Sequence, residues 1–267
     1  MATALVTGAS SGIGLELARL FAADGHDLVL VARRGDALKQ LAAELGSGHG
    51  VRATVIAADL ADPIGPAEIA RSVEAAGLEI EFLVNNAGYG MHGRFAQADA
   101  VEELGMLQVN VVALTHLTSL FLPAMLARGR GRIMNVASTA AFQPGPLMAV
   151  YYASKAYVLS FTEALAEEIR GTGVTVTALC PGPTTSGFQA RARMEAARLV
   201  RINPFMADAA SVAAAGYAGL MCGKRIVIPG IANKLVAQSV RFVPRVVATK
   251  VAALLNGAAG PPSEPPR

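Results

Sequence analysis

Two side chains four positions apart carry the most reactive chemistry in the sequence. Tyr151 and Lys155 lie in a stretch with helical character that begins near Ala149, so both side chains emerge on one helical face. A phenol with a pKa near ~10 is a poor acid or base at neutral pH. A neighbouring ammonium group favours the phenolate and lowers that pKa. The pair is therefore a candidate proton donor and acceptor, and Tyr152 is a rival for the tyrosine role.

Two other polar residues precede this pair. Ser138 directly follows a predicted strand, 132–137, and lies 13 residues before Tyr151. Asn110 stands in an apolar segment with helical spacing, where a buried amide is costly unless it is hydrogen-bonded. Asn110 is thus either a satisfied core residue that fixes a helix kink or a functional group.

A glycine-rich turn near the N-terminus is a candidate phosphate site. Residues 7–14 read Thr-Gly-Ala-Ser-Ser-Gly-Ile-Gly, after a predicted strand at 4–6 and before a helical pattern that ends near Gly25. A helix that starts at such a turn directs free N–H groups and its positive dipole end at one point. Gly8, Gly12 and Gly14 let the backbone approach a ligand closely. The simplest ligand is a dinucleotide; the alternative is a turn that binds nothing.

The elements that would position these residues alternate along the chain. Apolar runs predict strands at 4–6, 28–31, 51–57, 81–84, 132–137, 174–180 and 226–228, with helices between them, among them 36–45 and 66–76. This pattern predicts a single doubly wound, Rossmann-type α/β domain over residues 1–256, with a parallel sheet of seven strands and helices on both faces. Residues 257–267, rich in Pro, Gly and Ala, are predicted to be a disordered tail.

Composition narrows the functional classes. The 267 residues are 53% hydrophobic and 16% charged, with a net charge of +3. The sequence contains no Lys/Arg cluster with interleaved aromatic residues, so it does not indicate nucleic-acid binding. Cys180 and Cys222 form no disulfide framework, and the four histidines show no zinc spacing, so we expect no metal and two buried thiols in a reducing cytosol. Met1 to Val6 lacks the features of a signal peptide, which favours a cytoplasmic location.

Arg33 and Arg34 bear on the choice of dinucleotide. They follow strand 28–31, at the carboxyl edge of the predicted sheet. An acidic residue at this edge holds the ribose hydroxyls of NAD, whereas an arginine favours the 2′-phosphate of NADP. NADP(H) is therefore favoured over NAD(H). Alternatively, both arginines are the solvated start of helix 36–45.

Several of these motifs together resemble the classical short-chain dehydrogenases/reductases. They are the G-x-x-x-G-x-G spacing after Thr7, the Asn-Asn-Ala-Gly turn at 85–88, Tyr-x-x-x-Lys with Ser138 upstream, and the Pro-Gly turn at 181–182. The resemblance covers roughly residues 3–230. One departure is that many NADP-dependent relatives carry a basic residue inside the glycine turn, where this chain has Ser10 and Ser11.

The resemblance implies a role for each matching residue. The implied catalytic residues are Asn110, whose backbone would hold a water in a proton relay, Ser138, which would hold the substrate oxygen, Tyr151 as general acid and base, and Lys155. Asp59 would bind the adenine amino group, Lys155 the nicotinamide ribose and Thr184 the carboxamide. The full implied cofactor set is Gly8, Ser10, Ser11, Gly12, Ile13, Gly14, Arg33, Arg34, Asp59, Leu60, Asn86, Ala87, Gly88, Tyr151, Lys155, Pro181, Gly182 and Thr184.

The predicted function is an NADP(H)-dependent oxidoreductase. It would move a hydride between the nicotinamide and a carbonyl or secondary alcohol of a fairly apolar small molecule, as a homodimer or homotetramer. A 3-oxoacyl-(acyl carrier) reductase is the nearest alternative. A regulatory protein that binds the dinucleotide without turnover is an alternative of another class, although it would not need a proton donor.

Two C-terminal segments remain open to interpretation. Residues 185–210 are predicted to cover the substrate, with Arg191, Arg193, Arg198 and Arg201 either solvated or meeting an anionic group. Residues 231–255 predict a basic amphipathic helix, broken or kinked at Pro244, with Lys234, Arg241 and Arg245 on one stripe. This extension would dock on the protein's own core or a partner subunit, line an apolar substrate pocket, or rest on anionic lipid as a peripheral membrane contact.

Overall fold

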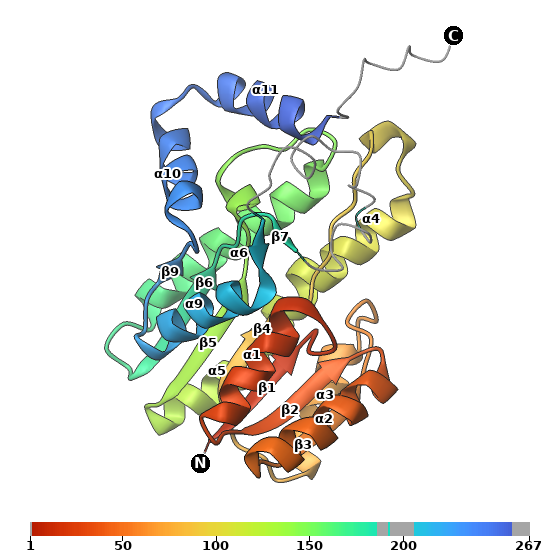
Figure 1. The fold of residues 1–267 in the computed structure, drawn as a ribbon, viewed down its shortest axis with the longest axis vertical. Coiled ribbons are helices and arrows are strands. Elements are labelled where there is room, and N and C mark those ends of the chain that lie inside the picture. Colours follow the sequence, from red (N-terminus) through yellow and green to blue (C-terminus); the bar gives the residue numbers. More distant parts are fainter. Residues whose placement is uncertain (1, 186–191, 193–205, 258–267) are drawn as a thin grey trace.

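The chain folds around one parallel sheet of seven strands. In the computed structural model, which describes residues 2–185, 192 and 206–257, the strand order is β3-β2-β1-β4-β5-β6-β9 (Figure 1). Every neighbouring pair in this sheet is parallel. The order reverses beside β1, so a crevice opens at the carboxyl ends of β1 and β4, where ligands bind in doubly wound folds. The predicted fold class is confirmed.

The strands lie close to the expected positions. Their bounds are β1 Thr3–Thr7, β2 Asp27–Ala32, β3 Ala53–Ala57, β4 Ile80–Asn85, β5 Gly131–Val136, β6 Val174–Leu179 and β9 Ile226–Val227. Side chains alternate between the two faces of each strand. In β1, for example, Ala4 and Val6 face one side of the sheet and Leu5 the other, and all three are fully buried.

Helices cover both faces of the sheet. One core contains side chains of α1 (Gly12–Ala23), α2 (Gly35–His49) and α9 (Ala209–Met221), and the opposite core those of α3 (Gly65–Ala75), α5 (Leu114–Arg128) and α6 (Ala149–Glu168). Phe21 and Leu117 are fully buried members of the two cores. Burying a side chain of this size stabilises the fold by about 1.5–3 kcal/mol.

One long helical run crosses the second face. It comprises α4 (Ala100–Leu107), a π-helical turn η2 (Gln108–Ala113) and α5. Its 29 residues are long and apolar enough to cross a membrane by length and composition alone. Leu117 and Met125 nevertheless pack into the core of the sheet, as in a core helix of an α/β protein.

The remaining elements lie beyond the carboxyl edge of the sheet. They are the short helices η1 (Phe95–Gln97) and η3 (Thr139–Phe142), and a two-stranded pair, β7 (Thr184–Thr185) with β8 (Ala207–Asp208). The C-terminal extension follows as α10 (Ile231–Ser239), η4 (Val240–Phe242) and α11 (Arg245–Asn256). In Figure 1 the extension arches above the sheet, at the end opposite to the N-terminus.

Two expectations need correction. The predicted break at Pro244 is present, but Val243 and Pro244 are extended and α11 runs in a new direction, so Lys234, Arg241 and Arg245 do not share one continuous stripe (Figure 1). Cys180 is buried as predicted, whereas Cys222 is exposed because it caps the end of α9 at the surface. Residues 258–267 of the predicted tail lie outside the described residues.

Candidate active site

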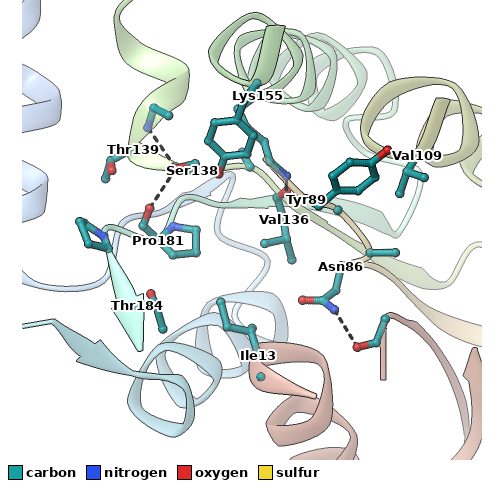
Figure 2. Close-up of a pocket in the computed structure, with 18 of the residues that line it drawn as sticks. Ile13, Asn86, Tyr89, Val109, Val136, Ser138, Thr139, Lys155, Pro181 and Thr184 are labelled. Atoms are coloured by element: carbon teal, nitrogen blue, oxygen red, sulfur yellow. Dashed lines mark hydrogen bonds between the residues drawn. The ribbon is translucent and has the colours of Figure 1, made fainter. Parts of the chain in front are cut away.

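The predicted site residues gather around one cavity. Its volume is about 990 Å³, and it lies in the crevice at the carboxyl ends of the central strands. All of the predicted site residues line it except Gly14 and Asn110, which lie behind its wall. In Figure 2, Ser138, Val136 and Lys155 lie on one side of the open space, and Ile13 and Asn86 lie on the opposite side.

The glycine turn forms the base of the cavity. Gly8 and Gly12 have φ angles of 66° and 57°, a left-handed conformation that favours glycine. A Cβ on Gly14 would lie 2.5 Å from the Gly8 carbonyl oxygen, so only glycine lets α1 approach the turn this closely. No side chain caps the N-terminus of α1 at Ser11. Its free N–H groups and dipole therefore remain available to an anion, which fits a dinucleotide diphosphate.

Asn86 supports this turn from the neighbouring strand. Its Nδ2 donates to the Thr7 carbonyl at 2.8 Å, and the Thr7 hydroxyl accepts from the backbone N–H groups of Asn86 and Ala87, each at 3.0 Å. Asn85, one residue earlier, donates to Asn135 Oδ1 of β5 at 2.9 Å. The amide side chains of the Asn-Asn-Ala-Gly turn thus tie β1, β4 and β5 together.

Two arginines form a positively charged rim at the ends of β2 and β3. Arg34 donates to the Ser10 hydroxyl and carbonyl oxygens at 3.1 and 3.3 Å. Arg33 lies 4.0 Å from the Asp59 carboxylate, and both of these side chains are half-exposed. Arg34 therefore brings a positive charge to the glycine turn, where this chain has Ser10 and Ser11 instead of a basic residue. The rim has the charge that a 2′-phosphate requires.

Asp59 is held by the backbone of the turn that follows it rather than by a helix. Its Oδ1 accepts from the Ala61 N–H at 3.0 Å, and α3 begins only at Gly65. Asp59 is therefore a turn residue at the end of β3 and does not cap the following helix. Its carboxylate lines the cavity beside Leu60, which leaves the predicted contact with an adenine amino group sterically open.

Tyr151 and Lys155 lie one turn apart in the first part of α6, as predicted. Tyr151 is 8% exposed and Lys155 5% exposed, and both side chains reach the cavity. Lys155 Nζ donates to the Val136 carbonyl at 2.7 Å and lies 5.9 Å from the Tyr151 ring centroid. Ser138 shares a hydrogen bond with the Tyr151 phenol, so serine and tyrosine present two hydroxyl groups to one point.

The protonation states differ from the expectation. Burial raises the pKa of Tyr151 to about 12, and the hydrogen bond with Ser138 opposes this rise only in part. Burial also lowers the pKa of Lys155 to about 8. The predicted lowering of the phenol pKa by Lys155 is therefore wrong for the protein residues alone. At neutral pH the phenol is protonated, which is the form that donates a proton.

Asn110 occupies the π-helical turn η2 and is 1% exposed. Its side chain accepts from the Tyr89 N–H at 3.0 Å and donates to the Tyr89 carbonyl and to Ser154 at 2.9 and 3.0 Å. Asn110 is thus a satisfied buried amide beside Lys155, at an irregularity of the helix. The π-turn interrupts the regular backbone hydrogen bonds of the helix around Asn110. A role for the Asn110 backbone in a proton relay stays a prediction.

Next to Ser138, whose hydroxyl donates to the Pro181 carbonyl at 3.4 Å, the cavity wall continues through the Pro-Gly turn and the C-terminal extension. Thr184 is buried, and its hydroxyl donates to the Gly182 carbonyl at 2.9 Å. Gly182 packs against Asn233 of α10 so closely that a Cβ would overlap it. The wall also includes residues outside the family motifs, and only Tyr152 and the extension among them were considered from the sequence: Gln143, Met148, Tyr152, Ala232, Asn233, Val236, Ala252 and Leu255.

Asn256, the last residue of α11, anchors the C-terminal extension beside α6. It is fully buried, its Oδ1 accepts from the Tyr152 hydroxyl at 3.3 Å, and its Nδ2 donates to the Pro146 carbonyl at 3.0 Å. His92 Nε2 bonds the Asn256 carbonyl at 2.7 Å. Tyr152 is thus a pocket-wall residue with a structural partner. The extension both docks on its own chain and lines the cavity, two of the three alternatives that the sequence left open.

The predicted substrate-covering segment is only partly described. Arg191, Arg193, Arg198 and Arg201 lie outside the described residues. Ala192 is buried, and its carbonyl accepts from the His92 N–H at 3.1 Å.

Comparison with known proteins identifies the class. The family model described as short chain dehydrogenase matches residues 2–197, most of the chain. The chain belongs to this family, and it is an oxidoreductase of the short-chain dehydrogenase type that acts on CH–OH or C=O groups.

Individual relatives share both sequence and fold. Ketoacyl reductase HetN of Nostoc sp. is 34% identical over 202 residues, which are 75% of this chain and 70% of HetN. A short-chain dehydrogenase from Sphingobium yanoikuyae in complex with NADPH is 34% identical, with a TM-score of 0.81 over 90% of this chain and 92% of that one. The bulky-bulky ketone specific alcohol dehydrogenase from Comamonas testosteroni is 31% identical, with a TM-score of 0.77 over 91% and 92%.

Proposed function

We propose that this protein is an NADP(H)-dependent carbonyl reductase for a bulky, mainly apolar ketone or the corresponding secondary alcohol. The observation that carries the proposal is the convergence of Ser138, Tyr151 and Lys155 on one wall of a cavity whose base is a helix N-terminus in a glycine turn. A hydroxyl pair next to an anion-binding turn fits carbonyl chemistry with a dinucleotide.

NADP(H) is the proposed cofactor. The rim formed by Arg33 and Arg34 would hold the 2′-phosphate, the turn at 8–14 the diphosphate, and Asp59 and Leu60 the adenine. Asn86, Ala87 and Gly88 would lie along the adenosine half, and Lys155, Pro181, Gly182 and Thr184 around the nicotinamide half. The NADPH in the Sphingobium relative supports this choice over NAD(H).

The reaction requires one hydride and one proton. The bound nicotinamide supplies the hydride for reduction, and it accepts one for oxidation. Tyr151 Oη donates its proton to the carbonyl oxygen, so that C=O becomes CH–OH and the phenol becomes phenolate. Ser138 orients the same oxygen by a hydrogen bond. Lys155, held by the Val136 carbonyl, places a cationic group within 5.9 Å of the Tyr151 ring centroid and stabilises the phenolate that forms.

The proposed substrate preference rests on the apolar residues of the cavity wall. Met148, Val236, Ala252 and Leu255 give this wall an apolar character, and the cavity holds about 990 Å³. The bulky ketone preference named for the Comamonas relative agrees with this wall. A 3-oxoacyl thioester is the second candidate, favoured by the ketoacyl reductase activity named for HetN.

The deciding experiment is a screen of NADPH oxidation against bulky ketones, aldehydes, steroids and 3-oxoacyl thioesters, read at 340 nm, the absorption band of the reduced nicotinamide. We expect turnover of at least one bulky apolar ketone, and less with NADH. Binding of NADPH without turnover of any substrate would instead support a regulatory dinucleotide-binding protein.

Homo-oligomerisation is also proposed, as a dimer or tetramer. It is supported by exposed apolar side chains on α4, η2 and α5, namely Val101, Leu104, Val112 and Leu120. Light scattering of the purified protein would give the subunit number, and a monomer would exclude this proposal.

A further inference from the structure

The outward faces of α10 and α11 are apolar. On α11 the exposed fractions of Val246, Val247, Val251 and Leu254 lie between 47% and 66%, whereas Ala252 and Asn256 on the inner face are buried. Phe242, just before α11, is 87% exposed, and Ile231 and Leu235 on α10 are 81% and 66% exposed. We call these seven residues the apolar face. A surface of this kind marks an interaction site more often than a solvated one.

Positive charge surrounds the apolar face, and all but one of these cations are without an acidic partner among the described residues. Residues 209–257 contain no aspartate or glutamate but contain Lys224, Arg225, Lys234, Arg241, Arg245 and Lys250. Arg225 pairs with Glu167 at 2.7 Å, and the other five form no ion pair with any described residue. On α11, Lys250 projects from the middle of the valine-rich side. The surface therefore combines exposed apolar groups with uncompensated cations.

Three of these cations line a second cavity. Lys224, Lys234 and Arg241 surround a recess of about 390 Å³ between α10 and β9, together with Gln238 and an apolar floor that includes Phe142 and Ile228. Lys234, Gln238 and Arg241 follow at helical spacing, next to the stripe of Ile231 and Leu235. Three cations and an amide over an apolar floor have the chemistry of a site for a phosphate that carries acyl chains.

We propose that the apolar face docks on the surface of an anionic phospholipid bilayer, with a lipid phosphate in the recess lined by Lys224, Lys234 and Arg241. The valine, leucine and phenylalanine side chains enter the acyl boundary, and the cations meet the headgroups. Lys250 reaches the headgroup layer with its ammonium while its methylene stem stays among apolar groups.

Charge decides between a bilayer and a second copy of the chain. A two-fold interface would place this surface against itself and bring the unpaired cations of both copies together. An anionic bilayer instead supplies the opposite charge over the whole surface. The bilayer is therefore the occupant that the charge distribution favours.

The apolar face is continuous with the catalytic cavity. Val236 and Leu255 line that cavity, are 58% and 40% exposed, and directly follow Leu235 and Leu254 of the outward side in sequence. Docking would place the wall of the substrate half of the cavity at the lipid boundary, where apolar ketones are enriched.

The test is sedimentation of the full-length protein with vesicles, of phosphatidylcholine alone or of phosphatidylcholine and phosphatidylglycerol in equal parts. We expect binding to the anionic vesicles, and binding that weakens as salt rises. In Arg241→Gln/Lys250→Gln, the affinity should fall about 25-fold, from about fivefold per cation near the surface. Phe242→Ser/Val246→Ser removes apolar side chains and keeps the cations, so the binding that persists at high salt should be lost.

The matched control is Lys39→Gln/Arg71→Gln. It removes the same charge from α2 and α3, at the other end of the molecule, where both side chains are more than 70% exposed. This variant should bind anionic vesicles like the wild type, and all three variants should keep turnover of a water-soluble ketone. The proposal is overturned if the protein binds neither vesicle, binds both equally, or loses binding equally in the control. It is also overturned if Phe242→Ser/Val246→Ser dissociates an oligomer in the absence of vesicles, because a second copy then covers this face.

Discussion

The two halves of the cavity are built in different ways. The proposed cofactor half, residues 8, 10–13, 33–34, 59–60 and 86–88, comes from the ends of four adjacent strands within the first third of the chain. The substrate half, Gln143, Met148, Tyr152, Ala232, Val236, Ala252 and Leu255, joins a loop and the start of α6 to a C-terminal extension some eighty residues further along. Ser138, Tyr151 and Lys155 lie where the two halves meet.

The geometry of the cofactor half is set by the fold, whereas that of the substrate half is set by side-chain contacts particular to this chain. The cofactor half uses backbone groups at strand ends and a helix N-terminus, which any doubly wound sheet of this order provides. The substrate half depends on side-chain contacts such as those of Asn256, which hold the extension in place. We therefore expect mutations to separate the two halves: some will affect cofactor binding alone, and others substrate binding alone.

The largest effect is expected at the junction of the two halves. Tyr151→Phe removes the proton donor but keeps the ring, so kcat should fall about 10²- to 10⁴-fold while the NADPH Kd stays the same. The matched variant Tyr152→Phe loses only the bond to Asn256 and should keep most of its turnover. Steady-state kinetics and NADPH fluorescence titration measure both quantities. Equal kcat in wild type and Tyr151→Phe would exclude the phenol from the reaction.

The second prediction concerns the effect of bound NADP⁺ on the pKa of Tyr151. Burial holds the pKa of Tyr151 at about 12 in the protein alone, so its phenol stays protonated up to alkaline pH. A positive charge nearby stabilises the phenolate and lowers the pKa, so NADP⁺ should lower it by about 1–3. Alcohol oxidation, which needs the phenolate, should then rise with pH, whereas ketone reduction should be flat near neutrality.

The measurement is a tyrosinate difference spectrum between wild type and Tyr151→Phe, titrated with and without NADP⁺. The subtraction isolates one of the five tyrosines. If the pKa of Tyr151 is the same with and without NADP⁺, the cofactor does not lower the pKa of this phenol.

The third prediction concerns the cofactor half alone. Arg33→Asp places a carboxylate at the positively charged rim, where it would repel a 2′-phosphate. Loss of a hydrogen bond to a charged group costs about 1.5–3 kcal/mol, so NADPH affinity should fall about 10- to 100-fold. The NADH Kd should improve or stay the same. Arg71→Asp, on the exposed side of α3, is the control and should change neither constant. Unchanged NADPH affinity in Arg33→Asp would make the 2′-phosphate assignment wrong.

The sequence could predict the cofactor half because its signals are local. A glycine turn, a run of buried strands and the spacing of Tyr151 and Lys155 each depend on a few neighbouring residues, and the structure places all of them as expected. The hydrogen bond from Arg34 to the Ser10 hydroxyl is not predictable from the sequence, but Arg34 lies at the predicted strand end.

The sequence left open whether the C-terminal extension lines the substrate pocket, because the geometry of the substrate half depends on contacts distant in sequence. Asn256 lies 104 residues after Tyr152 and 110 after Pro146, and no spacing rule links them. The same reason explains the error in the Tyr151 pKa, since spacing shows that Lys155 is near but not how deeply both side chains are buried. Helical periodicity also joined Lys234 to Arg245 across Pro244, where the chain changes direction.

The smallest effect is expected in the substrate half. Asn256→Ala removes two side-chain hydrogen bonds and leaves the half-buried Pro146 carbonyl without that donor. Such a loss costs about 1–2 kcal/mol, which loosens α11 over the cavity wall formed by Ala252 and Leu255. KM for a bulky ketone should rise about five- to 30-fold, with a smaller effect on kcat and none on the NADPH Kd. Leu254→Ala, on the outward side of α11, is the control and should keep the wild-type KM. A loss of NADPH affinity in Asn256→Ala would show that the two halves are coupled, because no contact of Asn256 reaches the residues that form the cofactor half.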